Sequence, residues 1–361
     1  MNGTNSIQTG AGRYYQYAGA IERLGREILE YSTQALVLYA DPVVAEKFAP
    51  KIDAVLNSAW VEQRKEIVEA PSRAETFEAV VAMANSMDAP VIVGVGGGRI
   101  LDIAKAAASR SGNKVITIPT SAATCAAYAL LYVEYGKEGN IAASHFLSHE
   151  ASCVIADLNF LVKECPARYF ISGMVDAMAK YPEYQFTTMC LGEEGISAPV
   201  RCAMVVADYT YRFYLEHGAQ AVEQFRRGEI TPLVEDMVNL NIMMTGILSD
   251  LSVGGKSLAL AHNYYDGICR LHPEIRKQYL HGELVAMALP MQLAVNGAPE
   301  EEIRALQEFL RILSVPTTLQ EIGFPAGEQA FDELCDYVYD VTKFESAPLR
   351  EKIRVGMEWM R

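Results

Sequence analysis

The sequence predicts an α/β domain followed by an all-helical domain. Short β-branched runs alternate with helical stretches over roughly the first 160 residues, and strand-like runs nearly vanish after about residue 163. Alternation of strands and helices favours a parallel sheet that is covered on both faces. The chain has 361 residues, which is enough for two domains. We therefore place the domains at residues 1–162 and 163–361.

Each predicted element follows from its length and its apolar spacing. Four apolar runs are too short for helices and are typical of buried strands: residues 35–40, 90–95, 114–118 and 153–156. Helical spacing in the first domain predicts helices over residues 21–31, 75–87 and 100–109. Helical spacing in the second domain predicts helices over residues 172–186, 199–217, 232–251, 257–266, 282–295, 300–313 and 329–342. The uncharged run 115–133 contains Pro119 and several hydroxyl residues, so we interpret it as a strand and loop, not a membrane span.

Composition argues against several classes of partner. The chain carries 31 Lys and Arg against 45 Asp and Glu, a net charge of −14, which disfavours nucleic acid and membrane surfaces. Its seven cysteines form no C-x-x-C pair, and their odd number indicates free thiols in a reducing compartment. The N-terminal residues lack a secretory signal pattern. We expect a cytoplasmic homo-oligomer that acts on a small molecule.

A glycine-rich segment is the strongest local motif. Gly94, Gly96, Gly97 and Gly98 follow a predicted strand and open a predicted helix. Glycines allow the backbone to approach a pyrophosphate, which the amides of a helix N-terminus can bind. The spacing is not G-x-G-x-x-G, and a tight turn without a ligand would also use glycine. Three successive glycines exceed what such a turn needs, so we favour phosphate binding.

Asp41 ends an earlier predicted strand. An acidic residue at such a strand end can accept hydrogen bonds from the adenosine ribose of a dinucleotide and would repel a 2′-phosphate. The same residue would also be a good N-cap for a helix that starts at Pro42. The two interpretations are compatible.

Asp176, His262 and His281 are candidate metal ligands in the helical half. One carboxylate and two imidazoles can hold Zn²⁺ or Fe²⁺ and leave a position open for substrate. Spacing alone does not establish this site. His262 could be a core histidine, His281 could be a helix N-cap, and Asp176 could pair with Lys180.

Several motifs in order give the chain a family resemblance. It resembles the glycerol dehydrogenase branch of the iron-containing alcohol dehydrogenases over nearly its whole length. The resemblance rests on residues 9–14, the glycine-rich segment 94–106, the loop 119–127, and the segments 172–180, 261–267 and 280–283. Each motif is modest alone, but their order and distances together are specific.

The resemblance implies a dinucleotide-binding domain and a helical domain, as in dehydroquinate synthase, with the active site in the cleft between them. It implies that Asp176, His262 and His281 bind one divalent ion, Zn or Fe. It also implies NAD(P)-linked hydride transfer to or from a small hydroxy acid or polyol, with NAD(H) favoured by Asp41. The cofactor contacts that it implies come from Gly96, Gly97, Gly98, Arg99, Asp102, Thr120, Thr124, Leu131 and Tyr135.

Three positions depart from the family pattern. Cys125 stands where glycerol dehydrogenases carry an aspartate that contacts the polyol, and the segment around it is closer to bacterial hydroxycarboxylate dehydrogenases, which reduce 2-oxo acids. Tyr265-Asp266 replaces the usual His-Asn pair. Pro182 follows the first metal segment, where relatives continue a helix. Because a proline inside a helix costs about 3 kcal/mol, we expect a kink or an early helix end there.

Four other functions compete with a hydroxycarboxylate dehydrogenase. Glycerol dehydrogenase proper differs only in substrate. A lyase of the dehydroquinate synthase type would carry a glutamate at Asp176 and a basic phosphate pocket, which is not evident here. A non-haem iron oxygenase would also use two histidines and a carboxylate, but on a β-barrel framework. A binding protein could have kept the fold and lost turnover.

Overall fold

A computed structural model describes residues 8–361 except 138, 140, 253–257 and 345. The chain packs as two compact units. The first comprises Met1–Gly136, Ile141–Phe170 and Glu223–Asp250, and the second comprises Lys137–Asn140, Ile171–Val222 and Leu251–Arg361. The segment Glu223–Asp250 thus packs with the α/β unit although it follows much of the helical unit in sequence. The domain boundary between residues 162 and 163 stays a prediction.

A six-stranded parallel sheet forms the centre of the first unit. Its order is β1-β8-β5-β4-β2-β3, and the register sets Val37 beside Val93 and Val93 beside Ile116. The strands are β1 (Tyr14–Tyr17), β2 (Gln34–Tyr39), β3 (Glu62–Ile67), β4 (Val91–Gly96), β5 (Val115–Pro119) and β8 (Cys153–Asp157). Two further strands, β6 (Leu131–Tyr135) and β7 (Ile141–Phe146), form an antiparallel pair. The parallel sheet and its four predicted strands are confirmed, and β1, β3, β6 and β7 are additions.

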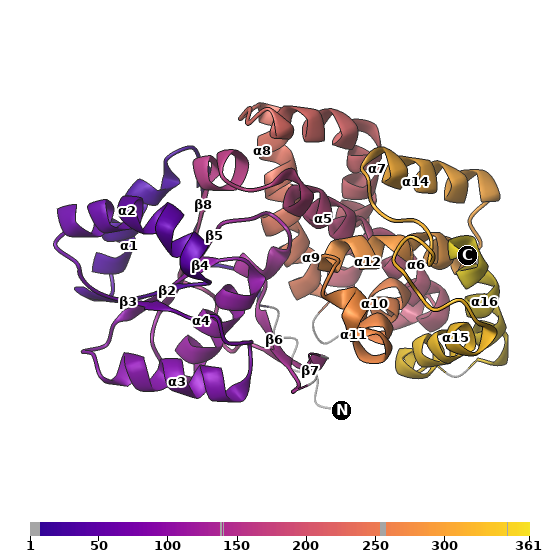
Figure 1. The fold of residues 1–361 in the computed structure, drawn as a ribbon, viewed down its shortest axis with the longest axis horizontal. Coiled ribbons are helices and arrows are strands. Elements are labelled where there is room, and N and C mark those ends of the chain that lie inside the picture. Colours follow the sequence, from indigo (N-terminus) through magenta and orange to yellow (C-terminus); the bar gives the residue numbers. More distant parts are fainter. Residues whose placement is uncertain (1–7, 138, 140, 253–257, 345) are drawn as a thin grey trace. The chain divides into compact units, whose positions relative to one another are not determined.

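Helices cover both faces of this sheet (Figure 1). The first face carries α1 (Leu24–Leu29) and α2 (Pro42–Ser58), whose Phe48 and Ile52 are buried in one cluster with Val37 and Val93. The opposite face carries α3 (Ala74–Asn85) and α4 (Gly98–Ser111). Gly94 lies under α4, where a Cβ would come within 2.8 Å of the Ala104 Cβ. The absence of a side chain at Gly94 therefore sets how closely α4 packs on β4.

Short helical segments complete the first unit. They are η1 (Ala20–Arg23), η2 (Cys125–Ala127), η3 (Asn159–Lys163), α8 (Pro232–Asn239), η5 (Leu240–Met244) and α9 (Thr245–Leu251). The predicted helix 232–251 is therefore helical throughout, with a π-helical stretch at η5 between two α-helices. The uncharged run 115–133 forms β5, a loop with η2, and the start of β6, as predicted.

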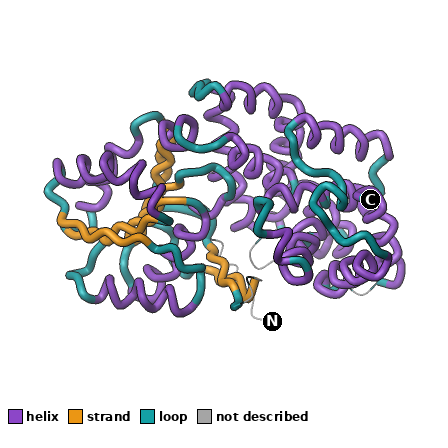
Figure 2. The backbone as a smooth tube through the Cα atoms, viewed as in Figure 1, coloured by secondary structure: helices purple, strands orange, loops and turns teal. Residues whose placement is uncertain are grey.

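The second unit is helical (Figure 2). Its α-helices are α5 (Ala167–Met178), α6 (Lys180–Leu191), α7 (Ala198–Arg226), α10 (Leu260–Leu271), α11 (Pro273–Arg276), α12 (His281–Met287), α13 (Leu289–Asn296), α14 (Glu300–Ile312), α15 (Glu328–Thr342) and α16 (Ala347–Met357), and the 3-10 turns are η4 (Glu193–Gly195) and η6 (Glu358–Met360). The predicted start of one helix at Ser257 lies outside the described residues. Across the described residues, no helix has both the length and the apolar character needed to cross a membrane.

Proline explains two helix breaks that bear on the site. The predicted helix 172–186 divides at Ala179, so that Pro182 falls in the first turn of α6, where no backbone N–H is needed. The expected early helix end just past Asp176 is confirmed. Pro290 similarly falls in the first turn of α13 and separates it from α12.

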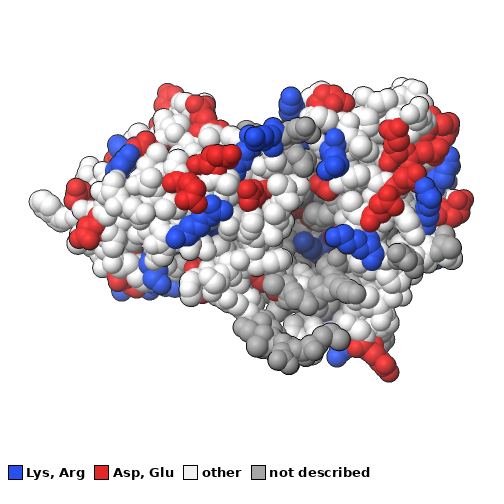
Figure 3. Space-filling model, turned by 90° about the horizontal axis from the view of Figure 1, so that it is seen from below, with Lys and Arg blue, Asp and Glu red and all other residues white. Residues whose placement is uncertain are grey.

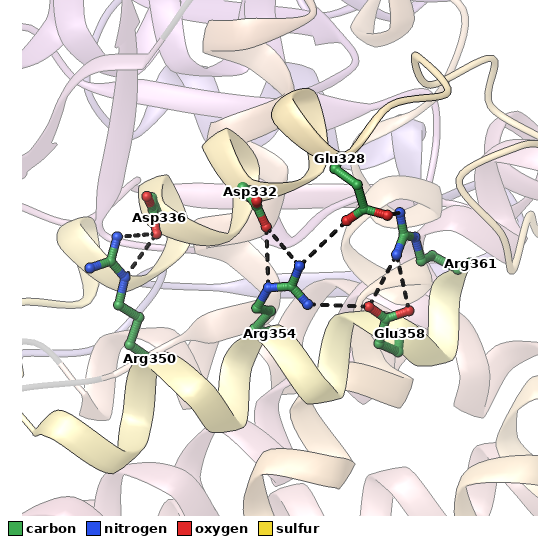
Figure 4. A network of polar contacts seen from close by, with 7 residues as sticks. All are labelled: Glu328, Asp332, Asp336, Arg350, Arg354, Glu358 and Arg361. Atoms are coloured by element: carbon green, nitrogen blue, oxygen red, sulfur yellow. Dashed lines mark hydrogen bonds and ion pairs between the residues drawn. The ribbon is translucent and has the colours of Figure 1, made fainter.

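Ion pairs join the end of the chain to α15 (Figure 4). Arg350 pairs with Asp336, and Arg354 lies 3.0 Å from Asp332. Arg361 pairs with Glu358 at 3.2 Å and also with Glu328. These side chains are partly or largely exposed, so each pair contributes little, and the network mainly fixes the orientation of the last helix.

The close packing of α4 on β4 gives a first prediction. Gly94→Ala should lower the free energy of unfolding by about 1–3 kcal/mol, because the new methyl group overlaps the Ala104 Cβ. Ala104→Gly alone should cost about 1 kcal/mol through helix propensity. Chemical denaturation of the two single variants and the double variant would measure the coupling. The double variant should be more stable than the sum of the single effects; strict additivity would contradict this account.

Candidate functional site

The glycine-rich turn joins β4 to α4 in the first unit. Gly96 has φ 149°, and a Cβ there would lie 2.6 Å from both Ala40 Cβ and Ile100 Cγ2, so only glycine fits. At Gly98 a Cβ would lie 3.3 Å from Thr124 Oγ1. Gly97 is the N-cap of α4, and no side chain of the described residues caps this helix end. The first amides of α4 could therefore bind an anionic ligand.

Arg99 ties this turn to the neighbouring strands. Its guanidinium donates to the carbonyl oxygens of Val68 and Ala70, each at 2.6 Å, and to that of Ala40. Burial lowers the pKa of Arg99, with Asp41 and Glu69 opposing the effect. The side chain therefore holds the ends of β2 and β3 against α4. Its predicted contact with a pyrophosphate stays a prediction.

Asp41 lies just beyond β2 and caps α2. Its Oδ1 accepts a hydrogen bond from the Val44 amide at 2.8 Å, and Pro42 follows in the first turn. The N-cap interpretation is therefore confirmed. The ribose interpretation remains compatible with it, because a carboxylate has a second oxygen and further acceptor sites.

Four further predicted cofactor residues, Thr120, Thr124, Leu131 and Tyr135, lie on one loop and on β6. We call residues 120–131 the Cys125 loop. Thr120 donates its amide to the Gly96 carbonyl at 3.0 Å, and Thr124 caps η2. Leu131 and Tyr135 begin and end β6. The structure thus brings Thr120 and Thr124 against the glycine-rich turn.

Asp102 and Cys125 differ in their surroundings. Asp102 is buried, and its Oδ2 accepts from the Val133 amide at 3.1 Å while its Oδ1 lies 3.1 Å from the Lys105 ammonium. Burial raises the pKa of Asp102, and Lys105 opposes this. Cys125 is half-buried, with its Sγ 3.9 Å from Ser249 Oγ. Both oxygens of Asp102 thus have partners within the protein.

Asp176, His262 and His281 converge in the second unit. Asp176 lies in the last turn of α5, His262 in the first turn of α10, and His281 begins α12. Their ligand atoms all lie within 4.8 Å of one another. Asp176 Oδ1 is 3.1 Å from His281 Nε2 and 3.5 Å from His262 Nε2. The sequence-predicted cluster is therefore a compact group of one oxygen and two nitrogens.

Close packing of α12 on α5 creates this convergence. Gly282 donates its amide to Ser172 Oγ at 3.2 Å, and a Cβ at Gly282 would lie only 1.9 Å from the Ser172 carbonyl oxygen. Ser172 and Asp176 are four residues apart and share a face of α5. The missing side chain at Gly282 therefore lets His281 reach Asp176. The LHGE motif contained this glycine, but its spacing alone did not reveal the role.

Glu183 is a site residue that the sequence analysis missed. Its buried Oε1 accepts hydrogen bonds from the His262 amide at 3.1 Å and from Nδ1 of the same residue at 2.8 Å. This contact keeps a proton on Nδ1, so Nε2, which faces Asp176, is the nitrogen of His262 that could bind a metal ion. The spacing of seven residues between Asp176 and Glu183, about two helical turns, is a signal that could have found it.

The electrostatics of the cluster favour a cation. Asp176 is buried, and its Oδ1 lies against the Nε2 atoms of His281 and His262. Burial would raise the pKa of Asp176, but His281 and His262 outweigh burial and lower it. Burial disfavours a charged His262, yet Glu183 and Asp176 raise its pKa to about 9. One carboxylate oxygen and two imidazole nitrogens around a site that attracts positive charge fit a divalent ion.

Tyr265 and Asp266, which replace the family's His-Asn pair, are both engaged. The edge of the buried Tyr265 ring packs on His281, with ring centroids 4.3 Å apart, and Tyr265 Oη accepts from Arg276 Nε at 2.7 Å. Asp266 accepts a hydrogen bond from Tyr337 Oη at 2.5 Å. Tyr265 thus supports His281 by packing.

Comparison with known proteins places the chain in a family. Residues 11–157 match the model of iron-containing alcohol dehydrogenases. The chain is 31% identical to a glycerol dehydrogenase of Thermotoga maritima over 86% of its length and 83% of the relative. It is 30% identical to hydroxycarboxylate dehydrogenase A of Escherichia coli, over 67% of its length and 66% of the relative. Its fold matches that of a probable glycerol dehydrogenase of Sinorhizobium meliloti, with a TM-score of 0.82, 24% identity and 99% of each chain covered.

The chain belongs to the iron-containing alcohol dehydrogenase family. It is a metal-dependent, nicotinamide-linked oxidoreductase that acts on CH–OH groups, with the two-domain fold of that family. The family implies a nicotinamide dinucleotide and a divalent metal ion as its cofactors. The family resemblance, fold class and enzyme class predicted from the sequence are confirmed.

Proposed function

We propose that Asp176, His262 and His281 hold one Zn²⁺ or Fe²⁺ ion and that the enzyme exchanges hydride between NAD(H) and a small 2-hydroxy or 2-oxo acid. The observation that carries the metal assignment is the convergence of a buried carboxylate oxygen, Asp176 Oδ1, with two imidazole nitrogens, since the three ligand atoms all lie within 4.8 Å of one another. Three donors leave a position for substrate.

The residues of the proposed site perform distinct tasks. When bound by Asp176, His262 and His281, a divalent ion would supply Lewis acidity for the negative charge on the substrate oxygen. Glu183 holds His262 in one tautomer, and Tyr265 packs against His281. We infer that the amides of Gly97 and Gly98 at the N-terminus of α4 bind the dinucleotide pyrophosphate, with Arg99 fixing the turn. Asp102, Thr120, Thr124, Leu131 and Tyr135 complete our proposed cofactor site.

Cys125 carries the proposal on substrate. A thiol lies where the family's glycerol dehydrogenases carry a carboxylate, so a vicinal diol loses one charged acceptor, and an anionic oxo acid meets less repulsion. A relative named hydroxycarboxylate dehydrogenase A supports this choice. Glycerol dehydrogenase proper is the second candidate, because other relatives carry that name.

Partners and location are inferred from charge and cysteine state. Acidic and basic side chains are interspersed on the face drawn in Figure 3, which supports a small-molecule enzyme that does not bind nucleic acid. All seven cysteines are free thiols, which supports a reducing compartment such as the cytoplasm. Self-association as a homo-oligomer stays a prediction that sedimentation would measure.

The metal assignment can be tested on His281. His281→Ala should remove stoichiometric metal and lower kcat at least a hundredfold while the protein stays folded, because a third donor is lost. His272→Ala is the matched control, since His272 lies in the same unit and contacts the Phe324 ring, outside the cluster. Elemental analysis and circular dichroism would be measured on both variants. Full metal occupancy with unchanged turnover in His281→Ala would exclude the cluster as the metal site.

Cofactor preference depends on the charge of Asp41. The parent should prefer NAD(H) over NADP(H), and Asp41→Gly should narrow or reverse that preference, because a carboxylate repels a 2′-phosphate. Asp41→Asn is the control for capping, since its side-chain oxygen can still accept from the Val44 amide. Both variants should change the ratio of kcat/KM values for the two cofactors. A parent that already favours NADPH tenfold would show that Asp41 is misplaced.

Substrate preference can be tested at Cys125. The parent should reduce 2-oxobutanoate or 2-oxoglutarate more efficiently than it oxidises glycerol, each at its favoured pH. Cys125→Asp should raise glycerol activity about tenfold and lower oxo-acid activity, because one hydrogen bond contributes about 0.5–1.5 kcal/mol and more when charged. Cys125→Asn, with the same shape and no charge, should give a smaller gain for glycerol. Equal kcat/KM values for the parent and both variants would show that position 125 does not select the substrate.

A further inference from the structure

The Cys125 loop is held by buried side chains of opposite charge that no catalytic step uses. Lys105 of α4 binds its carbonyl groups, and Asp250 of α9 binds one of its amides. Thr117 of β5 donates to the Ala127 carbonyl at 2.8 Å, and Asn241 of η5 donates to the Ala122 carbonyl at 3.0 Å. The Cys125 loop is thus contacted both by α4 and β5, which lie near it in sequence, and by η5 and α9, which come more than 100 residues later.

Lys105 is the cationic partner. It is 1% exposed, and its Nζ donates to the carbonyl oxygens of Ala126 at 2.7 Å, Ala129 at 3.1 Å and Leu131. Asp102 lies 3.1 Å from the same ammonium. A buried ammonium is stable only when its donors are satisfied, and three of the groups that satisfy this one belong to the loop backbone.

Asp250 is the anionic partner. It is 2% exposed, and it accepts from the Leu130 amide at 2.8 Å and from the Gly10 amide at 2.7 Å. Helix α9, which carries Asp250, packs closely on the loop. A Cβ at Gly246 of this helix would lie only 2.7 Å from the Tyr128 ring, so the close approach needs glycine there. Carbonyls of the loop thus meet a cation, and an amide of the loop meets an anion. Moving the loop would remove three carbonyl partners from the buried Lys105 and one amide partner from the buried Asp250, which is costly for buried charges.

We propose that Lys105 and Asp250 are positioning residues that hold the Cys125 loop in a single conformation. The loop places Thr124 against Gly98 and Cys125 beside Ser249, so its position sets where both side chains are presented. The consequence for catalysis rests on the proposed roles of Thr124 and Cys125. Holding of the loop itself is a property of the first unit alone and can be measured without substrate.

The test compares two isosteric changes at buried aspartates. Asp250→Asn places a side-chain NH₂ against a backbone amide and removes the charge that faces Leu130. Asp157→Asn is the matched control: Asp157 is 1% exposed and accepts from the Gly19 and Ile21 amides, each at 3.0 Å, on a different part of the unit. Both variants therefore lose the same kind of buried interaction, but only one contacts the loop.

Two readouts follow the loop directly in the full-length protein as purified. Amide hydrogen exchange in a peptide that spans residues 126–131 should be at least tenfold faster in Asp250→Asn, because local opening becomes easier. Alkylation of Cys125 by iodoacetamide, followed by peptide mass spectrometry, should accelerate by a similar factor. In Asp157→Asn both rates should stay within twofold of the parent. Unchanged rates in Asp250→Asn, or equal increases in both variants, would overturn the proposal.

Lys105→Met provides a separate test of the cationic partner, because methionine keeps an unbranched apolar chain and lacks the ammonium. It should show the same faster exchange over residues 126–131, and unchanged exchange there would overturn the role of Lys105. If this variant does not fold, as judged by loss of a cooperative melting transition, the two aspartate variants still decide the proposal.

Kinetics then separate this proposal from the proposed function. With NADH and 2-oxobutanoate, Asp250→Asn should lower kcat/KM about tenfold, mainly through KM, while bound metal remains stoichiometric. A parent that does not reduce 2-oxobutanoate would contradict the proposed substrate, whereas the exchange and alkylation results would stand unaffected.

Discussion

The candidate metal cluster depends on the burial of two carboxylates, Glu183 and Asp176, against the two nitrogens of the His262 ring. Glu183 binds Nδ1 of His262, and Asp176 faces Nε2 of the same ring and of His281. Burying two negative charges is costly unless positive charge accompanies them. The rest of the local structure meets this demand: α6 begins just after Asp176 and supplies Glu183, and the small Gly282 brings His281 close. This arrangement supports our proposal that the cluster holds a divalent cation.

In the α/β unit, the corresponding feature is the start of α4, where no side chain of the described residues caps the backbone amides. Gly96, Gly97 and Gly98 remove side chains from the turn, and Arg99 and Thr120 hold it through backbone carbonyls and amides. Many polar side chains of this unit therefore form their hydrogen bonds with backbone groups. If this turn binds the dinucleotide as we propose, such a fixed surface reduces the conformational entropy that is lost on binding.

The sequence predicted the parts of the fold that have a local signal. The strands around Val37, Val93, Ile116 and Ile155 are continuous apolar runs, so they were found. β3 was missed because Glu62–Ile67 is a charged edge strand without a buried face, and edge strands commonly carry such charges. At the sites, the metal cluster and the glycine turn lie in recognisable motifs. Glu183 lies 79 residues from His262, and Asp250 lies 120 residues from Leu130, so neither contact leaves a local pattern.

The path of the chain has a consequence for synthesis on the ribosome. The first unit is made from residues up to Phe170 together with Glu223–Asp250, so translation of its last segment ends 80 residues after Phe170. At about 5–20 residues per second, this corresponds to a delay of roughly 4–16 s. During that time the nascent α/β sheet lacks Asn241 and Asp250, the partners of the Cys125 loop. The α/β unit therefore cannot complete these contacts before Glu223–Asp250 has been translated.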